Sequence, residues 1–167
     1  MKHLYILRHA KTNQISKTGK DFDRALLPKG FDQLKDLQLF FDSFSLKNDV
    51  TILISSAKRT IQTFEGVKNV LQNKNSISTY SFHKNLYLAE LDELLKVIWN
   101  LQTDDNIFLI GHNFGISELA SYFTESDIEL STSEFIHLSF QCNHWNETSK
   151  GLAIVENRYH PLKNTNV

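Results

Sequence analysis

The sequence predicts an α/β fold: a three-layer α/β/α sandwich with a mostly parallel central sheet. Short apolar runs, typical of buried strands, alternate along the chain with longer segments whose apolar residues recur at three- and four-residue steps, as in amphipathic helices. This alternation favours parallel strands joined by helices that cover both faces of a sheet. No repeat, linker or low-complexity tract divides the 167 residues, so one domain over residues 1–167 is expected.

Six segments are expected to be strands. Short apolar runs, which favour buried strands, occupy residues 4–7, 50–54, 106–110 and 152–155. Residues 79–88 contain Tyr80 and Phe82 without a regular pattern, and a short irregular strand is expected there. Residues 135–140 alternate between apolar and polar side chains, which predicts a half-exposed strand.

Four helices are expected between the strands. Pro28 suits the first turn of the first helix, where its missing N–H costs nothing, and apolar side chains then recur up to Phe44. Ser56 is expected to cap a second helix that begins near Ala57 and ends before a loop at residues 72–78. The third helix follows an acidic start, which the helix dipole favours, and the fourth begins after Gly115.

The composition excludes several classes of protein. A formal net charge of -1 produces no global field that would attract nucleic acid or a membrane surface. The single cysteine, Cys142, cannot form an internal disulfide or a cysteine-based zinc site. The first apolar run is too short for a signal peptide, and no run approaches the length of a membrane span. A cytoplasmic monomer that binds neither nucleic acid nor membrane is therefore expected.

Unusual polar residues stand at three junctions between an expected strand and the helix or loop that follows. The junctions carry Arg8 and His9, then Ser55, Ser56 and Arg59, then Gly111, His112 and Asn113. If the strands are parallel, all three junctions lie at one edge of the sheet, where ligands bind in open α/β folds. Two arginines and two histidines are therefore expected to converge there.

This set of side chains suits a phosphoryl group. Guanidinium groups bind phosphate oxygens two at a time, and helix N-termini add backbone donors for an anion. A histidine can attack phosphorus and form a covalent phosphohistidine. A second histidine, if protonated, can donate to the equatorial oxygens in the transition state.

Three segments resemble the signatures of the histidine phosphatase superfamily, whose fold is described as phosphoglycerate mutase-like. They are residues 7–10 (Leu-Arg-His-Ala), 55–63 (Ser-Ser-Ala-Lys-Arg-Thr-Ile-Gln-Thr) and 111–115 (Gly-His-Asn-Phe-Gly). The chain length and residues 24–30, 86–89 and 131–133 are similar to the small SixA-type phosphohistidine phosphatases. The resemblance runs from the first strand to about residue 140. Phe114 stands where the family commonly has proline, and Leu27 where it often has threonine.

The resemblance implies a role for each candidate residue. His9 is the expected nucleophile, and Arg8 and Arg59 are expected to hold the phosphoryl oxygens. His112 is expected to contact the transferring group and to stabilise the transition state. Arg24 matches a family arginine near the phosphate and is a further candidate for substrate binding. No metal or other cofactor is implied.

The resemblance does not identify a general acid. Glu90, Asp92 and Glu93 are near enough in sequence to supply one, but acids in the first turn of a helix are ordinary. A phosphohistidine substrate has less need of an acid, because the leaving nitrogen of its labile P–N bond is easily protonated, whereas an alkoxide is a poor leaving group.

The expected function is a metal-independent phosphatase that acts on a phosphorylated protein, with phosphohistidine as the preferred substrate. A short chain leaves little material for a lid, and an open site suits a protein better than a small metabolite. A small-molecule phosphomonoesterase of the same fold and a pseudo-phosphatase that binds phosphorylated partners without turnover are alternatives. A mutase would need to enclose its substrate against water. A metal site on His9 and His112 is disfavoured by the adjacent arginine.

Overall fold

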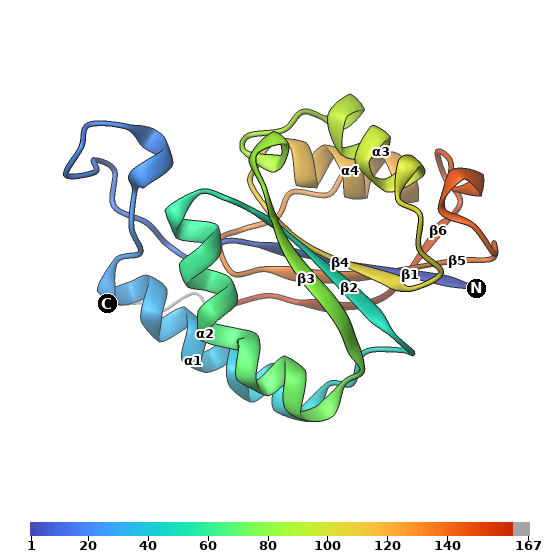
Figure 1. Cartoon of the computed structure of the whole chain (residues 1–167), viewed down its shortest axis with the longest axis horizontal. Coiled ribbons are helices and arrows are strands. Elements are labelled where there is room, and N and C mark those ends of the chain that lie inside the picture. The colour runs from blue at the N-terminus through green and yellow to red at the C-terminus, as the bar shows by residue number, and fades with distance from the viewer. Residues whose placement is uncertain (162–167) are drawn as a thin grey trace.

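A six-stranded sheet lies between two layers of helices in the computed structural model, which describes residues 1–161, the Lys74 side chain apart (Figure 1). The strands are β1 (Lys2–Arg8), β2 (Val50–Ser55), β3 (Ile77–His83), β4 (Asn106–Gly111), β5 (Phe135–Phe140) and β6 (Ala153–Tyr159). The α-helices are α1 (Pro28–Ser43), α2 (Lys58–Lys74), α3 (Leu91–Asn100) and α4 (Gly115–Thr124), and short 3-10 helices span Asp21–Asp23, Lys84–Leu86 and Trp145–Glu147. The expected three-layer α/β/α architecture is confirmed.

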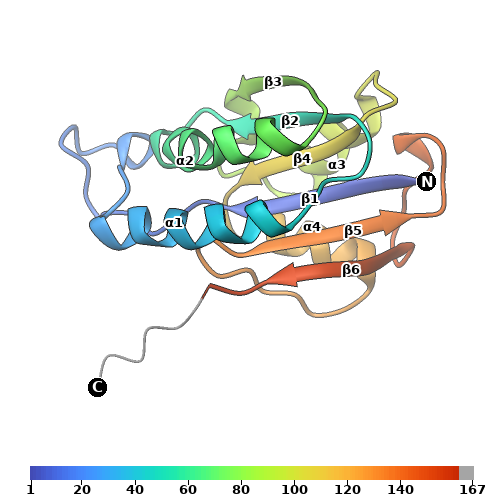
Figure 2. The same ribbon diagram turned by 90° about the horizontal axis from the view of Figure 1, so that it is seen from below.

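The sheet has the strand order β3-β2-β4-β1-β5-β6 and is mostly parallel, as predicted. β4 pairs in parallel with both β1 and β2, and β2 pairs in parallel with β3, whereas β5 runs antiparallel to β1 and β6. The carboxyl ends of β1, β2 and β4 therefore lie at one edge of the sheet, at the left in Figure 2, where β1 runs leftward from the N-terminus.

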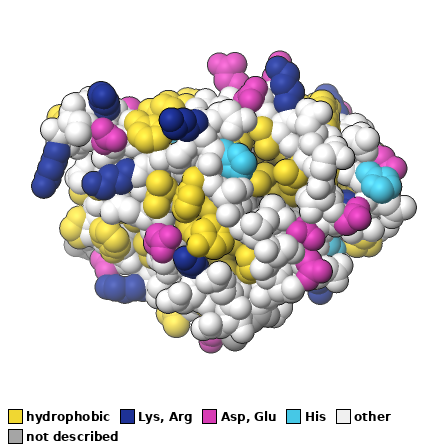
Figure 3. Space-filling model, in the orientation of Figure 1, with side chains coloured by type: hydrophobic (Ala, Val, Ile, Leu, Met, Phe, Trp, Pro, Cys, Tyr) yellow, Lys and Arg dark blue, Asp and Glu magenta, His cyan; other side chains and the backbone are white. Residues whose placement is uncertain are grey.

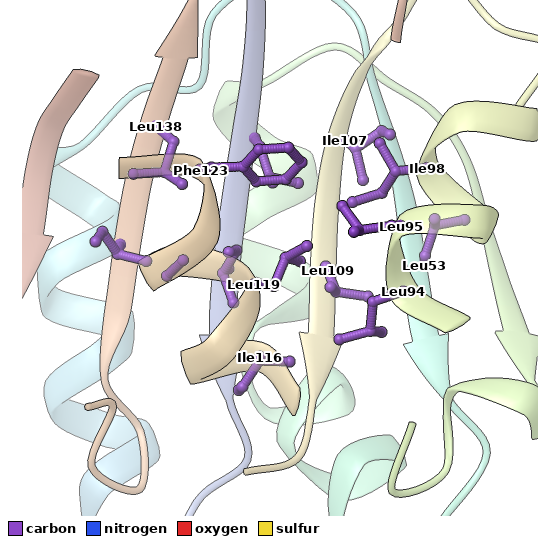
Figure 4. Close-up of a cluster of buried hydrophobic side chains, with 14 of the residues drawn as sticks. Leu53, Leu94, Leu95, Ile98, Ile107, Leu109, Ile116, Leu119, Phe123 and Leu138 are labelled. Atoms are coloured by element: carbon purple, nitrogen blue, oxygen red, sulfur yellow. The ribbon is translucent and has the colours of Figure 1, made fainter. Parts of the chain in front are cut away.

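The two faces of the sheet bury different side chains. Leu4 and Ile6 of β1 belong to a largely aliphatic cluster under α3 and α4, part of which is drawn in Figure 4. Tyr5 and Leu7 point to the opposite face, where α1 and α2 pack over an aromatic cluster that includes Phe41. Full burial of a side chain such as Phe41 stabilises the fold by about 1.5–3 kcal/mol. The period-two alternation of β1 thus anchors it in both cores and fixes the position of its carboxyl end.

The predicted boundaries near α2 and β3 were partly wrong. Ala57, not Ser56, is the N-cap of α2, and its carbonyl accepts from Thr60 N–H at 3.1 Å and from the Thr60 hydroxyl at 2.7 Å. α2 also continues to Lys74, into the expected loop. The strand expected over residues 79–88 is β3, which begins earlier, at Ile77, and ends at His83, where a 3-10 turn follows. Its pairing with β2 contains a shift in register at Val50 and Thr51, so an irregularity is present as expected.

β5 and β6 also differ from the prediction. All six residues of β5 are buried, although a half-exposed strand was expected. β5 lies between β1 and β6, and its polar side chains find buried partners: His137 contacts His3, and Ser139 donates to Glu156 at 2.5 Å. β6 is longer than expected and runs to Tyr159.

β3 is an edge strand with a partly apolar outer surface. Its Tyr80 and Phe82 side chains are exposed, and Figure 3 shows hydrophobic side chains gathering near the middle of the face that contains β3, with charged groups mostly around them. Within residues 1–161, none of the helices is both long and apolar enough to cross a bilayer.

Candidate active site

The three predicted junctions meet in one cavity of about 580 Å³ at the carboxyl edge of the sheet. The structure brings all five predicted site residues to its lining: Arg8, His9, Arg24, Arg59 and His112. Arg8 ends β1, and His9 follows it directly. Arg59 lies in the first turn of α2, as predicted, and His112 follows β4. The parallel pairing of three buried strands therefore positions side chains that are separated by up to 104 positions in the chain.

The hydrogen bonding of His9 defines which ring nitrogen is available. His9 Nδ1 lies 2.8 Å from the carbonyl oxygen of Ala10. A carbonyl oxygen can only accept, so Nδ1 carries the hydrogen and the neutral ring has its lone pair on Nε2. Burial lowers the pKa of His9, and the hydrogen bond to Ala10 opposes this effect. The charges of Arg59, Arg8 and Arg24 also lower the pKa, which is about 3. The His9 ring is therefore unprotonated at neutral pH, the form in which an imidazole can act as a nucleophile.

His112 is held in the complementary tautomer. Arg59 Nε donates to His112 Nδ1 at 3.2 Å, so the hydrogen of the neutral ring is on Nε2, which donates to the Ser55 hydroxyl at 2.7 Å. Burial, followed by the charge of Arg59, lowers the pKa of His112 to about 2. The rings of His9 and His112 lie with their centroids 5.2 Å apart. A phosphoryl dianion between them would oppose this effect and favour protonation of His112.

Arg8 has a donor left over for a ligand. Its Nη1 donates to the carbonyl oxygen of Leu130 at 2.7 Å, whereas its buried Nε has no hydrogen-bond partner within the part of the chain that the structure describes. The same Leu130 carbonyl accepts from Asn113 Nδ2 at 2.9 Å. Burial lowers the pKa of Arg8, but a guanidinium remains charged at neutral pH. Because Arg8 lines the cavity, its guanidinium can offer donors other than the one bonded to Leu130 to a phosphoryl oxygen.

Asp21 is a site residue that the sequence analysis missed. Its carboxylate accepts from Arg24 Nη1 at 2.6 Å, from Arg59 Nη2 at 2.9 Å and from the Tyr87 hydroxyl at 2.7 Å. Its carbonyl oxygen also accepts from Arg59 Nη1 at 2.8 Å. The i,i+3 spacing of Asp21 and Arg24 was the one signal in the sequence that could have indicated this contact.

Arg24 is tied to its surroundings by all three guanidinium nitrogens. Besides the bond to Asp21, Nε donates to the Asn13 carbonyl and Nη2 to the Thr12 hydroxyl, both at 2.6 Å. Arg24 therefore lines the cavity and positions Asp21. Its predicted contact with the substrate stays a prediction.

Glu90 does not line this cavity. It is the N-cap residue of α3 and lies in a neighbouring depression that shares only Leu88 and Asn113 with the cavity of His9. Gly115 allows the start of α4 to pack closely against Ala89, because a Cβ at position 115 would lie 1.9 Å from the Ala89 carbonyl oxygen. Among residues 1–161, no three His, Cys, Asp or Glu side chains are grouped so that they could hold a metal ion.

The cavity is strongly cationic. Among the described residues that line it, Arg8, Lys11, Arg24 and Arg59 are cationic, and Asp21 has the one carboxylate. Because the two histidines are neutral, the excess of positive charge comes from fixed guanidinium and ammonium groups. A neutral nucleophile beside several fixed cations can bind a phosphoryl dianion and attack its phosphorus.

No protein-family model and no curated protein matches the chain, but solved structures do. Proteins assigned as phosphohistidine phosphatase SixA from Nakamurella multipartitia and Agrobacterium tumefaciens superimpose with TM-scores of 0.77 and 0.76, each at 20% identity over 96% of this chain and 96% and 98% of theirs. The protein histidine phosphatase SixA in complex with tungstate gives a TM-score of 0.73 at 17% identity, over 95% of this chain and 97% of that chain.

A more distant neighbour is a phosphoserine phosphatase from Entamoeba histolytica in complex with 3-phosphoglyceric acid. Its TM-score is 0.59 at 12% identity, over 96% of this chain and 98% of that chain. The SixA structures are thus more similar to this chain than this phosphoserine phosphatase is. The chain has the fold of the phosphoglycerate mutase-like histidine phosphatases, in the form seen in SixA proteins.

Proposed function

We propose that the protein is a phosphohistidine phosphatase that works through a phosphorylated His9. The observation that carries this proposal is the hydrogen bond from His9 Nδ1 to Ala10, which leaves the Nε2 lone pair in a cavity lined by Arg8 and Arg59. Nucleophilic attack on a phosphoryl dianion requires a neutral imidazole close to fixed cations, and His9 has this environment.

The proposed reaction has two steps. In the first, the bond from His9 Nε2 to phosphorus forms, the P–N bond of the substrate breaks, and its electron pair remains on the leaving imidazole. Arg8 and Arg59 hold the phosphoryl oxygens, and His112, once protonated beside the dianion, donates to them. In the second step water adds to phosphorus, the bond to Nε2 breaks with its electron pair returning to His9, and the water proton leaves with phosphate or solvent.

Two features support phosphohistidine over an alkyl phosphate. First, Glu90 lies outside the cavity, and Asp21 is held ionised by its three donors, so neither is placed as a general acid. A leaving imidazole is easily protonated and tolerates this, whereas an alkoxide gains more from an acid. Second, the solved structures with TM-scores of 0.77 and 0.76 are named as phosphohistidine phosphatases, and the one with 0.73 as a protein histidine phosphatase.

The test uses a protein that carries phosphohistidine and, separately, an aryl phosphate, both in the presence of a chelator. We expect phosphate release from the phosphoprotein by the wild-type chain and none by His9→Ala. The matched control is His144→Ala, because His144 is exposed and lies outside the cavity. Trapping of a ³²P-labelled intermediate on His9 in acid-quenched samples would identify the nucleophile directly.

The alternatives predict different outcomes. Turnover of the aryl phosphate alone would indicate a small-molecule phosphomonoesterase with the same mechanism. Phosphate binding without turnover of either substrate would indicate a pseudo-phosphatase. Loss of activity with the chelator would contradict the metal-independent mechanism.

We also propose that the chain acts as a monomeric single domain in the cytoplasm on a phosphorylated protein. The single cysteine and the near-neutral charge support this setting. Light scattering of the purified chain and fractionation of cells that express it test the two parts separately.

A further inference from the structure

The Asp21 carboxylate is the group in the cavity whose charge the proposed mechanism does not use. It is the only carboxylate among the described residues that line the cavity. The Asp21 side chain is 40% exposed, whereas His9 is only 7% exposed. Asp21 therefore lies nearer the mouth of the cavity than the nucleophile does.

The direction of attack places the leaving group on the same side. In-line transfer to His9 Nε2 requires the leaving atom on the far side of phosphorus from His9. His9, Arg59 and His112 are all buried and form the floor of the cavity, so the leaving group must lie toward the mouth. Arg59 donates to Asp21 and borders the phosphoryl position, so Asp21 lies beside the path of the leaving group.

Asp21 is held in place as a fixed negative charge. Burial would raise its pKa, but hydrogen bonds from Tyr87 and Arg24 and the charge of Arg59 outweigh burial and hold the pKa well below its usual range. Three donors at 2.6 to 2.9 Å also fix the position of the carboxylate. A fixed anion at this position attracts a cationic leaving group and repels an anionic one.

We propose that Asp21 is a specificity-determining residue that selects substrates by the charge of the leaving group. It favours phosphoramidates of a basic nitrogen, such as an imidazole or amine that carries a proton, and disfavours phosphate esters whose leaving group carries a carboxylate or phosphate. This inference rests on the proposed phosphatase function and deepens it. When a protonated phosphoimidazole reacts, the P–N bond breaks, its electron pair stays on the leaving nitrogen, and the ring departs neutral with the proton on its other nitrogen.

The experiment compares two aryl phosphates that differ only in the para substituent, trimethylammonium in one and carboxylate in the other. The quantity measured is the ratio of their kcat/KM values, cationic over anionic, for the wild type and for Asp21→Asn. We expect the ratio to fall about ten-fold in Asp21→Asn, since the intrinsic reactivity of the two esters cancels in the comparison. Asp23→Asn is the matched control: Asp23 is in the same 3-10 turn, accepts from Thr18 and does not line the cavity.

Each outcome decides the matter. If both kcat/KM values fall equally in Asp21→Asn, the ratio is unchanged and Asp21 only supports the arginines, which overturns the inference and leaves the proposed function intact. If the wild type turns over neither aryl phosphate nor a phosphohistidine protein, the proposed function fails and the inference fails with it. If Asp21→Asn does not fold, Asp21→Ser, which also removes the charge, should show the same fall in the ratio, and a ratio equal to that of the wild type would overturn the inference.

Discussion

Two buried histidine pairs lie near the two ends of β1, and only one of them is proposed to be catalytic. Near its start, His3 Nδ1 lies 3.0 Å from His137 Nε2. Just beyond its end, His9 lies beside His112. All four rings are buried, and burial lowers the pKa of each.

The pairs differ in what their nitrogens face. His3 and His137 share one hydrogen bond with each other, and the charged groups that act on both are Glu156 and Lys47. His9 and His112 are instead bonded to separate partners, and arginines surround them. A histidine with a lowered pKa is thus not in itself a catalytic residue. The free lone pair of His9 and the cations around it distinguish the two pairs.

The largest expected effect distinguishes the two histidine pairs directly. His9→Ala should reduce phosphate release at least about ten-thousand-fold, because the proposed nucleophile is lost. His3→Ala should leave kcat per folded molecule unchanged but lower the free energy of unfolding by about 1–3 kcal/mol, because it leaves His137 without its partner. Steady-state phosphate release and urea unfolding of both variants measure the two effects. Equal losses of activity would mean that both pairs serve the reaction.

A smaller effect is expected at the arginine that holds His112. Arg59→Lys should lower kcat/KM about 100-fold, because an ammonium group cannot donate to His112 and to Asp21 in the geometry of the guanidinium. The matched change beside the other pair, Lys47→Arg, should leave kcat/KM unchanged. Kinetics with a phosphohistidine protein measure both, and an Arg59→Lys variant with wild-type kcat/KM would contradict the role given to Arg59.

Acid should destabilise the fold through both pairs. The folded-state pKa values of about 3 for His9, about 2 for His112 and about 4 for His137 lie below the ordinary value near 6.5. Below pH 6.5 the unfolded chain therefore binds more protons than the folded chain. Stability should fall as pH falls from 6.5 to 4.5, with each of these histidines contributing up to about 1 kcal/mol per pH unit.

Urea unfolding at several pH values measures this slope. His137→Phe should remove the contribution of one proton from it, which tests whether the non-catalytic pair shares in the effect. A free energy of unfolding that is constant over this range would show that the histidines titrate normally in the folded state.

The smallest expected effect distinguishes the two histidine pairs without a mutation. Inorganic phosphate in the cavity should raise the pKa of His112 and His9 by roughly one unit or more, because a nearby anion favours the protonated ring. The pKa values of His3 and His137 should not change, since that pair lies at the other end of β1. NMR titration of ¹⁵N-labelled histidines with and without phosphate measures all four. A uniform shift of the four rings would indicate a global effect of the salt.

The parts of the fold and site that could be predicted are those set by strand periodicity. The apolar runs that end at Arg8, Ser55 and Gly111 are buried parallel strands, and parallel strands bring their carboxyl ends to one edge. That rule was enough to bring His9, Arg59 and His112 together. The prediction needed no knowledge of side-chain contacts.

The rest depended on contacts that local sequence does not encode. Asp21 lies in a polar loop without periodicity, and its partners Arg59 and Tyr87 are 38 and 66 positions away. The burial of β5 depends on β6 pairing with its outer edge and on His3 as a partner for His137. In each case a distant segment decided whether a polar side chain is exposed or paired.

Main-chain carbonyl groups hold much of the candidate site in place. The carbonyl oxygens of Ala10, Asn13, Asp21 and Leu130 accept from His9, Arg24, Arg59 and Arg8. A substitution at an accepting position changes its side chain but keeps its carbonyl oxygen. Positions such as 10, 13 and 130 can therefore diverge through evolution while the path of the backbone still orients the functional side chains.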